Sequence, residues 1–323
     1  MKFDISDSGM LSKDEAKKIL LENDVPCSNL EMIIGSFSKG LFIVDRTYVL
    51  RTSAHPMEIE AEKLQRIKEL PGVPKLVRTG TYSSSGDPIF FILATLIPGT
   101  DLFDEIDKLT VAQAIEIGQE VSDFLNKLHT IEGSTYDIGH YVPTVPMYKG
   151  TWRMGHVEYW QRLNAELSKL ELLESTRQII DEADKYFHRN LSCLDYQQGP
   201  KLLHNDFHMK NIIVLDGLFS GVIDWECSQY GEVDFEFIHL IHWALEGSKI
   251  GETITRFSKA VLGRQAQSLN IPDLETRLTI YLLEHDLNQI VWAHGTEKDN
   301  YIQRIQMWLD DRVTVRELVS DFH

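Results

Sequence analysis

The chain has 323 residues, 43% of them hydrophobic, which is long enough for about two lobes with a sizeable core. Its net charge of −17 disfavours nucleic acid and anionic membranes as partners and attracts cations. The three cysteines are scattered and form no Cys-x-x-Cys pair, which argues against disulfides and structural zinc. The N-terminus is acidic, and no apolar run approaches the roughly 18 residues of a membrane span, so a cytoplasmic protein is expected.

The first part of the chain is predicted to form a small antiparallel sheet with one inserted helix. A capping-box pattern from Ser12 to Glu15 begins a helix over about 12–23. Short runs rich in β-branched and aromatic residues then alternate with turn signals. These runs lie at 32–34, 41–44, 48–51, 76–82 and 89–97. An apolar helical stripe interrupts them over 57–70 and ends at Pro71-Gly72.

After Pro98-Gly99 the pattern becomes mostly helical. Helices are expected at 110–129, 156–170, 173–189, 234–246, 252–268, 273–294 and 298–318. Only the segments 201–206, 211–215 and 221–225 read as β structure, around a polar loop. The expected architecture is therefore α+β, without alternating β and α elements. Residues 1–97 would form a β-rich N-lobe, with a hinge near 94–99 and a helical C-lobe over 98–323.

The most informative motif is His204-Asn-Asp-Phe-His-Met-Lys-Asn211, with the spacing H-x-D-x-x-x-x-N. Asp224 follows 13 residues later, in Val222-Ile-Asp-Trp225. Phosphoryl transfer needs a base that orients the attacking hydroxyl and oxygen ligands that hold Mg²⁺ against the phosphates. Asp206 suits the base, and Asn211 and Asp224 offer the hard oxygen donors that Mg²⁺ prefers. The competing interpretation is a surface loop followed by an aspartate in a β-turn.

On these motifs the sequence resembles the aminoglycoside phosphotransferase and choline kinase family, which shares its architecture with protein kinases. The family's loop reads His-Gly-Asp where this chain has His204-Asn205-Asp206, and its Ile-Asp-Trp segment matches residues 223–225. The resemblance implies a protein-kinase-like bilobal fold, with Asp206 as the catalytic base. It also makes Asn211 and Asp224 the Mg²⁺ ligands.

Two further residues receive structural roles from the resemblance. His204 would orient the catalytic loop by hydrogen bonding. Asp234, in Gly231-Glu-Val-Asp234, matches an aspartate that the family carries at the start of a helix. There it would cap free backbone N–H groups.

The segment Gly35-Ser-Phe-Ser-Lys-Gly40 resembles a Walker loop in its glycine spacing. However, Leu41-Phe42 follows where that motif requires Lys and then Ser or Thr, so a P-loop nucleotide-binding protein is excluded. In the kinase-like interpretation the segment is a hairpin turn over the phosphates, and Ser36 and Ser38 would reach phosphate oxygens.

Arg51 ends the run Tyr48-Val-Leu-Arg51, where most relatives carry lysine to hold the α- and β-phosphates. The hygromycin B kinase and macrolide kinase branches also carry Val-Leu-Arg and give the nearest resemblance. Arginine is planar and bidentate, so the exchange is not neutral. Glu60 on the inserted helix is its expected partner, with Glu62 or Glu58 as alternatives. Backbone groups from Ala94 to Leu96 would bind the base of ATP or GTP.

The acceptor is expected to be a small cationic molecule. Residues 273–323 hold ten acidic side chains and five Lys or Arg, and the resemblance places the acceptor beside such helices. Glu226, Glu284 and Asp286 are the candidate contacts, and an aminoglycoside, with antibiotic resistance by O-phosphorylation, is the leading expectation. A kinase for choline, a methylthio sugar or homoserine is the alternative. The complete set of catalytic-loop residues argues against a third interpretation, a non-catalytic pseudokinase.

Overall fold

The computed structural model describes residues 11–33, 40–83, 88–137, 150–247, 251–293, 295, 297–310 and 315–316. The chain divides into two compact units. The first comprises Met1–Gly99 together with Ser220–Glu226, and the second comprises Thr100–Phe219 and Cys227–His323. The expected lobe boundary at 97/98 does not anticipate the return of 220–226 to the first unit. Within the described residues, no helix is both long and apolar enough to cross a membrane.

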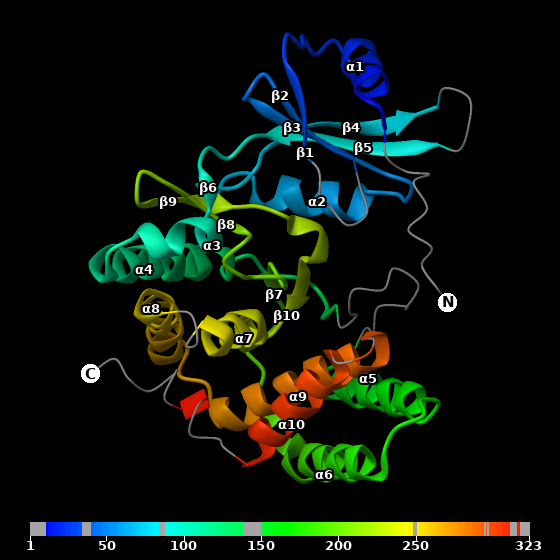
Figure 1. Cartoon of the computed structure of the whole chain (residues 1–323), viewed down its shortest axis with the longest axis vertical. Helices are drawn as coiled ribbons and strands as arrows, with labels where there is room; N and C mark the ends of the chain where they lie inside the picture. The colour runs from blue at the N-terminus through cyan, green and yellow to red at the C-terminus, as the bar shows by residue number, and fades with distance from the viewer. Residues whose placement is uncertain are drawn as a thin grey trace. The chain divides into compact units, whose positions relative to one another are not determined.

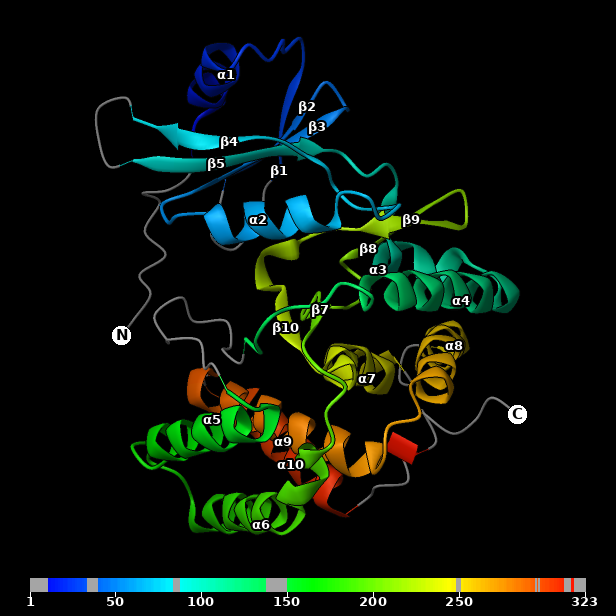
Figure 2. The ribbon, with the colours of Figure 1, turned by 180° about the vertical axis from the view of Figure 1, so that it is seen from behind.

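The first unit is built on a five-stranded sheet with the order β1-β2-β3-β5-β4, in which every neighbouring pair is antiparallel. Its strands are β1 (Leu30–Ile33), β2 (Gly40–Val44), β3 (Tyr48–Ser53), β4 (Leu76–Tyr82) and β5 (Ile89–Thr95). Helix α2 (Glu58–Ile67) is inserted between β3 and β4. Helices α1 (Lys13–Glu22) and α2 lie on opposite sides of the sheet (Figures 1 and 2).

Local sequence chemistry accounts for these elements. Ser12 and Glu15 form the predicted capping box at the start of α1, and the buried face of the helix carries Ile19 and Leu20. In β2 alternate residues are buried, so that Phe42 and Val44 join the same hydrophobic core as α1. The predicted antiparallel sheet with one inserted helix is confirmed.

The second unit is mainly helical. Its α-helices are α3 (Leu102–Glu105), α4 (Val111–Leu128), α5 (Trp152–Leu167), α6 (Glu174–Asn190), α7 (Phe237–Gly247), α8 (Glu252–Leu269), α9 (Leu274–Trp292) and α10 (Glu297–Asp310). Helix α4 packs along α8, and α9 packs against α5, α6, α7 and α10 (Figure 2). Helix α9 is therefore the central helix of this group, and more than half of its residues are buried.

Several helix starts differ from the prediction. Helix α5 begins at Trp152, earlier than expected, because the Thr151 hydroxyl accepts the N–H of Met154 as an N-cap. Helix α7 begins at Phe237, later than expected, because the preceding residues form the 3₁₀ turn η4 (Val233–Glu236). The described part of α10 ends at Asp310, short of the predicted 318. Three further 3₁₀ turns are η1 (Ile106–Lys108), η2 (Leu191–Asp195) and η3 (Trp225–Cys227).

Short strands frame the polar loop. Strand β7 (Lys201–Leu203) pairs antiparallel with β10 (Gln229–Gly231). Strand β6 (Thr100–Asp101) pairs with β8 (Ile212–Leu215), and β9 (Leu218–Val222) is the third strand of that sheet. The predicted strand over 221–225 is wrong in its second half. Asp224 has a φ of +66°, which ends the extended conformation, and Trp225 begins η3.

Candidate active site

The H-x-D-x-x-x-x-N motif forms a loop between β7 and β8 in the second unit. Its second residue, Asn205, has a φ of +65°, a left-handed conformation that asparagine tolerates better than most residues. The buried carboxylate of Glu236 accepts the backbone N–H of His204 at 2.7 Å and that of Asn205 at 2.8 Å. Gln229 donates to the side-chain oxygen of Asn205 at 3.0 Å. Buried groups from β10 and η4 thus hold the backbone that presents Asp206.

The Asp206 carboxylate is 24% exposed and lies among polar groups. The side-chain amide of Asn211 donates to the backbone carbonyl of Asp206 at 2.9 Å and to Oδ2 of the same residue at 3.2 Å. On the other side, Nε2 of His208 lies 3.5 Å and Nε2 of His239 lies 3.9 Å from Oδ1. Burial raises the pKa of Asp206, but the His208 hydrogen bond and the His239, His208 and His204 imidazoles outweigh it and hold the pKa below its usual value. Asp206 is therefore ionised at neutral pH.

Asp224 belongs to the first unit. The segment that carries it lies close to the turn after α2, where the N–H of Val222 donates to the carbonyl of Gly72 at 2.8 Å. A Cβ on Gly221 would come within 2.3 Å of that carbonyl oxygen, so only glycine permits this approach. The left-handed φ of Asp224 then ends the extended path of this segment.

Arg51 contacts three carboxylates within the first unit. Its Nη1 lies 2.5 Å from Oε1 of Glu60, so the predicted ion pair is present. Its Nη2 lies 2.9 Å from Oε2 of Glu226 and 3.2 Å from Oδ1 of Asp224. Glu60 is buried, whereas the side chains of Glu226 and Asp224 are 36% and 39% exposed. One guanidinium thus faces three carboxylates, which leaves an excess of negative charge.

This donor chemistry fits a hard divalent cation. Oδ1 of Asp224 is buried and accepts no hydrogen bond from any described residue, although Arg51 lies near it. A buried carboxylate oxygen without a donor is an incomplete site unless a cation or water completes it. In the second unit, the amide nitrogen of Asn211 faces Asp206, so its carbonyl oxygen is the atom suited to a metal. The oxygen donors predicted for Mg²⁺ are chemically suitable in both units.

The structure gives less support to the other predicted nucleotide contacts. Ser36 and Ser38 lie outside the described residues. Ala94 is buried in β5, and the N–H of Leu96 donates to the carbonyl of Thr47 at 2.8 Å. That N–H is therefore occupied, so a base would have to meet other backbone groups of this stretch. Recognition of the base here stays a prediction.

The two acids expected to face the acceptor lie in the interior of the second unit. Glu284 is buried beside His156, with its Oε2 2.7 Å from Nδ1, and burial raises its pKa well above the usual value. Asp286 is buried and bound by Arg304 at 2.5 Å and by the indole N–H of Trp308 at 2.6 Å. Both have internal partners, which weighs against direct contact with an acceptor, and that contact stays a prediction.

Asp286 also belongs to a cluster with metal-ligand spacing. His242, His285 and Asp286 are the only described group of three such residues whose ligand atoms lie within 4.8 Å of one another. Oδ1 of Asp286 lies 3.5 Å from His242 and 3.3 Å from His285. The guanidinium of Arg304 already neutralises this carboxylate, so a dication would bring two further positive charges into a buried, neutral pair. The cluster is better explained as packing around an ion pair.

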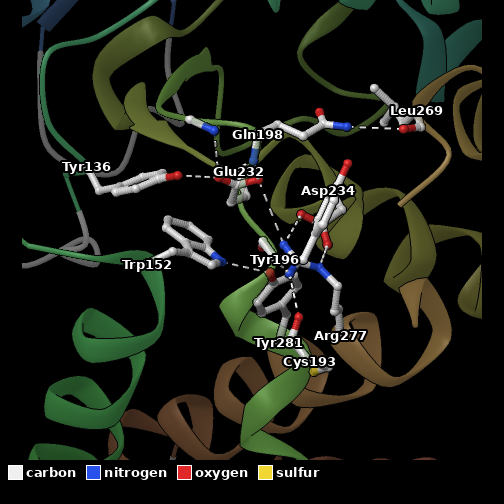
Figure 3. A network of polar contacts seen from close by, with 11 residues as sticks. Tyr136, Trp152, Cys193, Tyr196, Gln198, Glu232, Asp234, Leu269, Arg277 and Tyr281 are labelled. Carbon is white, nitrogen blue, oxygen red and sulfur yellow. Dashed lines mark hydrogen bonds and ion pairs between the residues drawn. The ribbon is translucent and has the colours of Figure 1, made fainter. Parts of the chain in front are cut away.

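Asp234 is structural, but its partner differs from the prediction. Instead of capping backbone N–H groups, its carboxylate accepts Nε of Arg277 at 2.5 Å and Nη2 at 3.1 Å (Figure 3). Arg277 is fully buried and also donates to the carbonyls of Cys193 at 2.8 Å and Tyr196 at 2.9 Å. An arginine reaching from α9 makes this ion pair, which local sequence cannot reveal.

Glu232 extends the same network. It accepts the hydroxyl of Tyr136 and the backbone N–H groups of Gln198 and Gly199 (Figure 3). Burial raises its pKa despite these hydrogen bonds. The network holds the segment from β10 to η4, and the same segment supplies Gln229 and Glu236 to the loop that carries Asp206. Gln229, Glu236 and His239 were not predicted, because nothing in their sequence positions distinguishes them from ordinary buried polar residues.

Comparison with known proteins agrees with this architecture. Residues 38–266 match the model of the phosphotransferase enzyme family. No curated protein matches the sequence. Among solved structures, the complex of APH(2″)-IIa with streptomycin and ATP is 18% identical, with 92% of this chain and 97% of that chain covered and a TM-score of 0.66.

Two further structures are similar. A thermostable mutant of APH(4)-Ia with AMP-PNP and hygromycin B is 17% identical, with 93% and 98% of the two chains covered and a TM-score of 0.65. ADP-bound APH(2″)-Ib is 17% identical, with 96% and 100% covered and a TM-score of 0.63. The predicted α+β, protein-kinase-like bilobal fold is confirmed.

Proposed function

The chain belongs to the phosphotransferase enzyme family, and on that premise we propose that it moves the γ-phosphate of a nucleoside triphosphate to a hydroxyl of a small molecule. One observation carries the proposal. The Asp206 carboxylate accepts a hydrogen bond from Asn211, in a loop whose backbone is held by Glu236. A base on a rigid, preorganised loop is what positioning of an attacking hydroxyl requires.

The roles follow from the chemistry of each group. Asp206 would accept the proton of the acceptor hydroxyl as the bond from that oxygen to phosphorus forms and the bond to the leaving diphosphate breaks. The oxygens of Asn211 and Asp224 would hold Mg²⁺. When bound, the ion neutralises charge on the phosphate oxygens. The reaction needs both the base and the metal ligands, so the proposal predicts that loss of either strongly lowers turnover.

The acceptor class is the finer part of the proposal. The net charge of −17 favours a cation, and the similar structures include complexes with streptomycin, gentamicin and hygromycin B. An aminoglycoside would gain charge-assisted hydrogen bonds from exposed carboxylates. A metabolite kinase of the choline, methylthio sugar or homoserine type is the second candidate. The burial of Glu284 and Asp286 supports it to the extent that it weighs against two acidic contacts predicted for an aminoglycoside.

A phosphorylation screen tests the proposal. The purified protein is incubated with MgCl₂ and either ATP or GTP, against hygromycin B, streptomycin, gentamicin, a macrolide, choline, methylthioribose and homoserine. Mass spectrometry then detects the phosphorylated acceptor, with Asp206→Asn and a chelator as controls. Transfer to an aminoglycoside that high salt weakens supports the cationic assignment. Transfer only to a neutral or amino-acid metabolite overturns that assignment. Nucleotide binding without transfer to any hydroxyl overturns the kinase proposal itself.

A further inference from the structure

Glu226 takes an unexpected position in the first unit. It was expected to face the acceptor, but its carboxylate lies 2.9 Å from Nη2 of Arg51. The other terminal nitrogen of the same guanidinium lies 2.5 Å from Glu60. Arg51 stands on β3, Glu60 on α2 and Glu226 in η3. One side chain therefore bridges two carboxylates from elements that are far apart in the sequence.

The fork shape of arginine makes both contacts possible at once. A guanidinium is planar and presents its two terminal nitrogens in fixed, diverging directions. With Nη1 on Glu60 and Nη2 on Glu226, rotation of the group about its long axis would break one of the two contacts. A lysine ammonium at the same position is a single point charge on a flexible stem and has no such fork. The second carboxylate thus matters because residue 51 is arginine.

The two acids differ in burial and therefore hold Arg51 in different ways. Glu60 is buried on α2 and makes the shorter contact, so it anchors the guanidinium from inside the unit. Glu226 is 36% exposed and contacts the other nitrogen, so it holds the guanidinium from the side nearer the solvent. Asp224 lies 3.2 Å from the same nitrogen without hydrogen-bond geometry, so Glu226 is the stronger holder of Nη2.

We infer that Glu226 is a positioning residue, which together with Glu60 holds the Arg51 fork in the orientation that binds the nucleotide phosphates. The inference rests on the proposed function, since it assumes that Arg51 meets those phosphates. Glu226 acts through Arg51 and touches neither acceptor nor phosphate. If Glu226 instead competed with phosphate for Nη2, its removal would change nucleotide affinity in the opposite direction.

The test measures nucleotide dissociation constants with Mg²⁺ by calorimetry, which needs no acceptor and no turnover. For Glu226→Gln, the constant should rise about three- to tenfold, because a partly exposed charged contact is lost. Glu62→Gln is the matched control. This variant also removes one negative charge, here from α2. Because Glu62 pairs with Arg66 and not with Arg51, nucleotide affinity should stay unchanged. Tighter binding in Glu226→Gln would overturn the inference, and so would no change.

A double-mutant cycle then isolates the pair. Arg51→Lys should weaken nucleotide binding in the wild-type background. In the Glu226→Gln background the same substitution should cause a smaller fold-loss of affinity, by at least about twofold. Equal effects in both backgrounds would show that Glu226 does not act through Arg51. If Glu226→Gln changes only the KM of the acceptor, Glu226 is an acceptor contact and the inference is wrong. If wild-type protein binds no nucleotide, the proposed function fails, and that result is distinct from the others.

Discussion

The catalytic-loop residues of the second unit and the Arg51 cluster of the first unit are built in different ways. Around Asp206, the supporting acid Glu236 is buried and accepts hydrogen bonds from the backbone itself. Around Arg51, two of the three acids are more than a third exposed, and both lie against one shared guanidinium. The first arrangement fixes the path of the chain, whereas the second orients one charged side chain and contributes little to the stability of the fold.

Arg277→Met should have the largest effect on stability, because it leaves the buried carboxylate of Asp234 without its counter-charge. We expect the free energy of unfolding to fall by about 3–5 kcal/mol, measured by urea denaturation. The double variant Arg277→Met with Asp234→Leu should recover part of that loss, since no unpaired Asp234 charge remains. A single variant as stable as the wild type would show that the support of the loop does not depend on this ion pair.

Glu236→Gln should have an intermediate effect. Glutamine keeps one acceptor oxygen, but its amide group then faces one of the two N–H donors of His204 and Asn205. We expect a loss of about 1–3 kcal/mol in unfolding free energy, with a lower kcat because Asn205 is no longer held at its positive φ.

Glu132→Gln provides the control for this experiment. Glu132 is exposed and pairs with Lys201 of β7, so the same change of charge should leave stability and kcat nearly unchanged. Equal losses in both variants would contradict the special role of Glu236.

Much of the architecture could be predicted from sequence, since it depends on local chemistry. The capping box at Ser12, the apolar stripe of α2 and the period-two burial of β2 each act over a few residues. The pairing of Arg51 with Glu60 was also predictable, because a strand end and the following helix are near in sequence. The motif spacing together with the family resemblance predicted the roles of Asp206, Asn211 and Asp224, which remain proposals.

The parts that could not be predicted depend on contacts between distant segments. Glu226 lies 175 residues from Arg51, and Arg277 lies 43 residues from Asp234. Charge composition also gave no sign that Glu284 and Asp286 are buried, because an acidic residue count does not distinguish exposed acids from those buried beside histidine or arginine. Strand β10 has only three residues, too few for a clear pattern.

Arg51→Lys should have the smallest effect on stability, which sharpens the contrast between the two regions. A partly exposed ion-pair cluster contributes little to folding, so we expect the free energy of unfolding to change by less than about 1 kcal/mol. Nucleotide affinity should fall in the same variant, because the lysine cannot span Glu60 and Glu226. Urea denaturation and calorimetry on one preparation check both parts. A loss of stability as large as that of Arg277→Met would remove the distinction.

The most direct test compares Asp206→Asn with Asp224→Asn for two quantities, kcat and the dissociation constant of the Mg²⁺–nucleotide complex. Asp206→Asn should lower kcat by about 10²–10⁴-fold and leave the dissociation constant nearly unchanged, because a base acts on the acceptor. Asp224→Asn should impair both quantities, because it removes a charged metal ligand. The account is contradicted if Asp206→Asn keeps more than about a tenth of wild-type kcat, or if Asp224→Asn binds the Mg²⁺–nucleotide complex as tightly as the wild type.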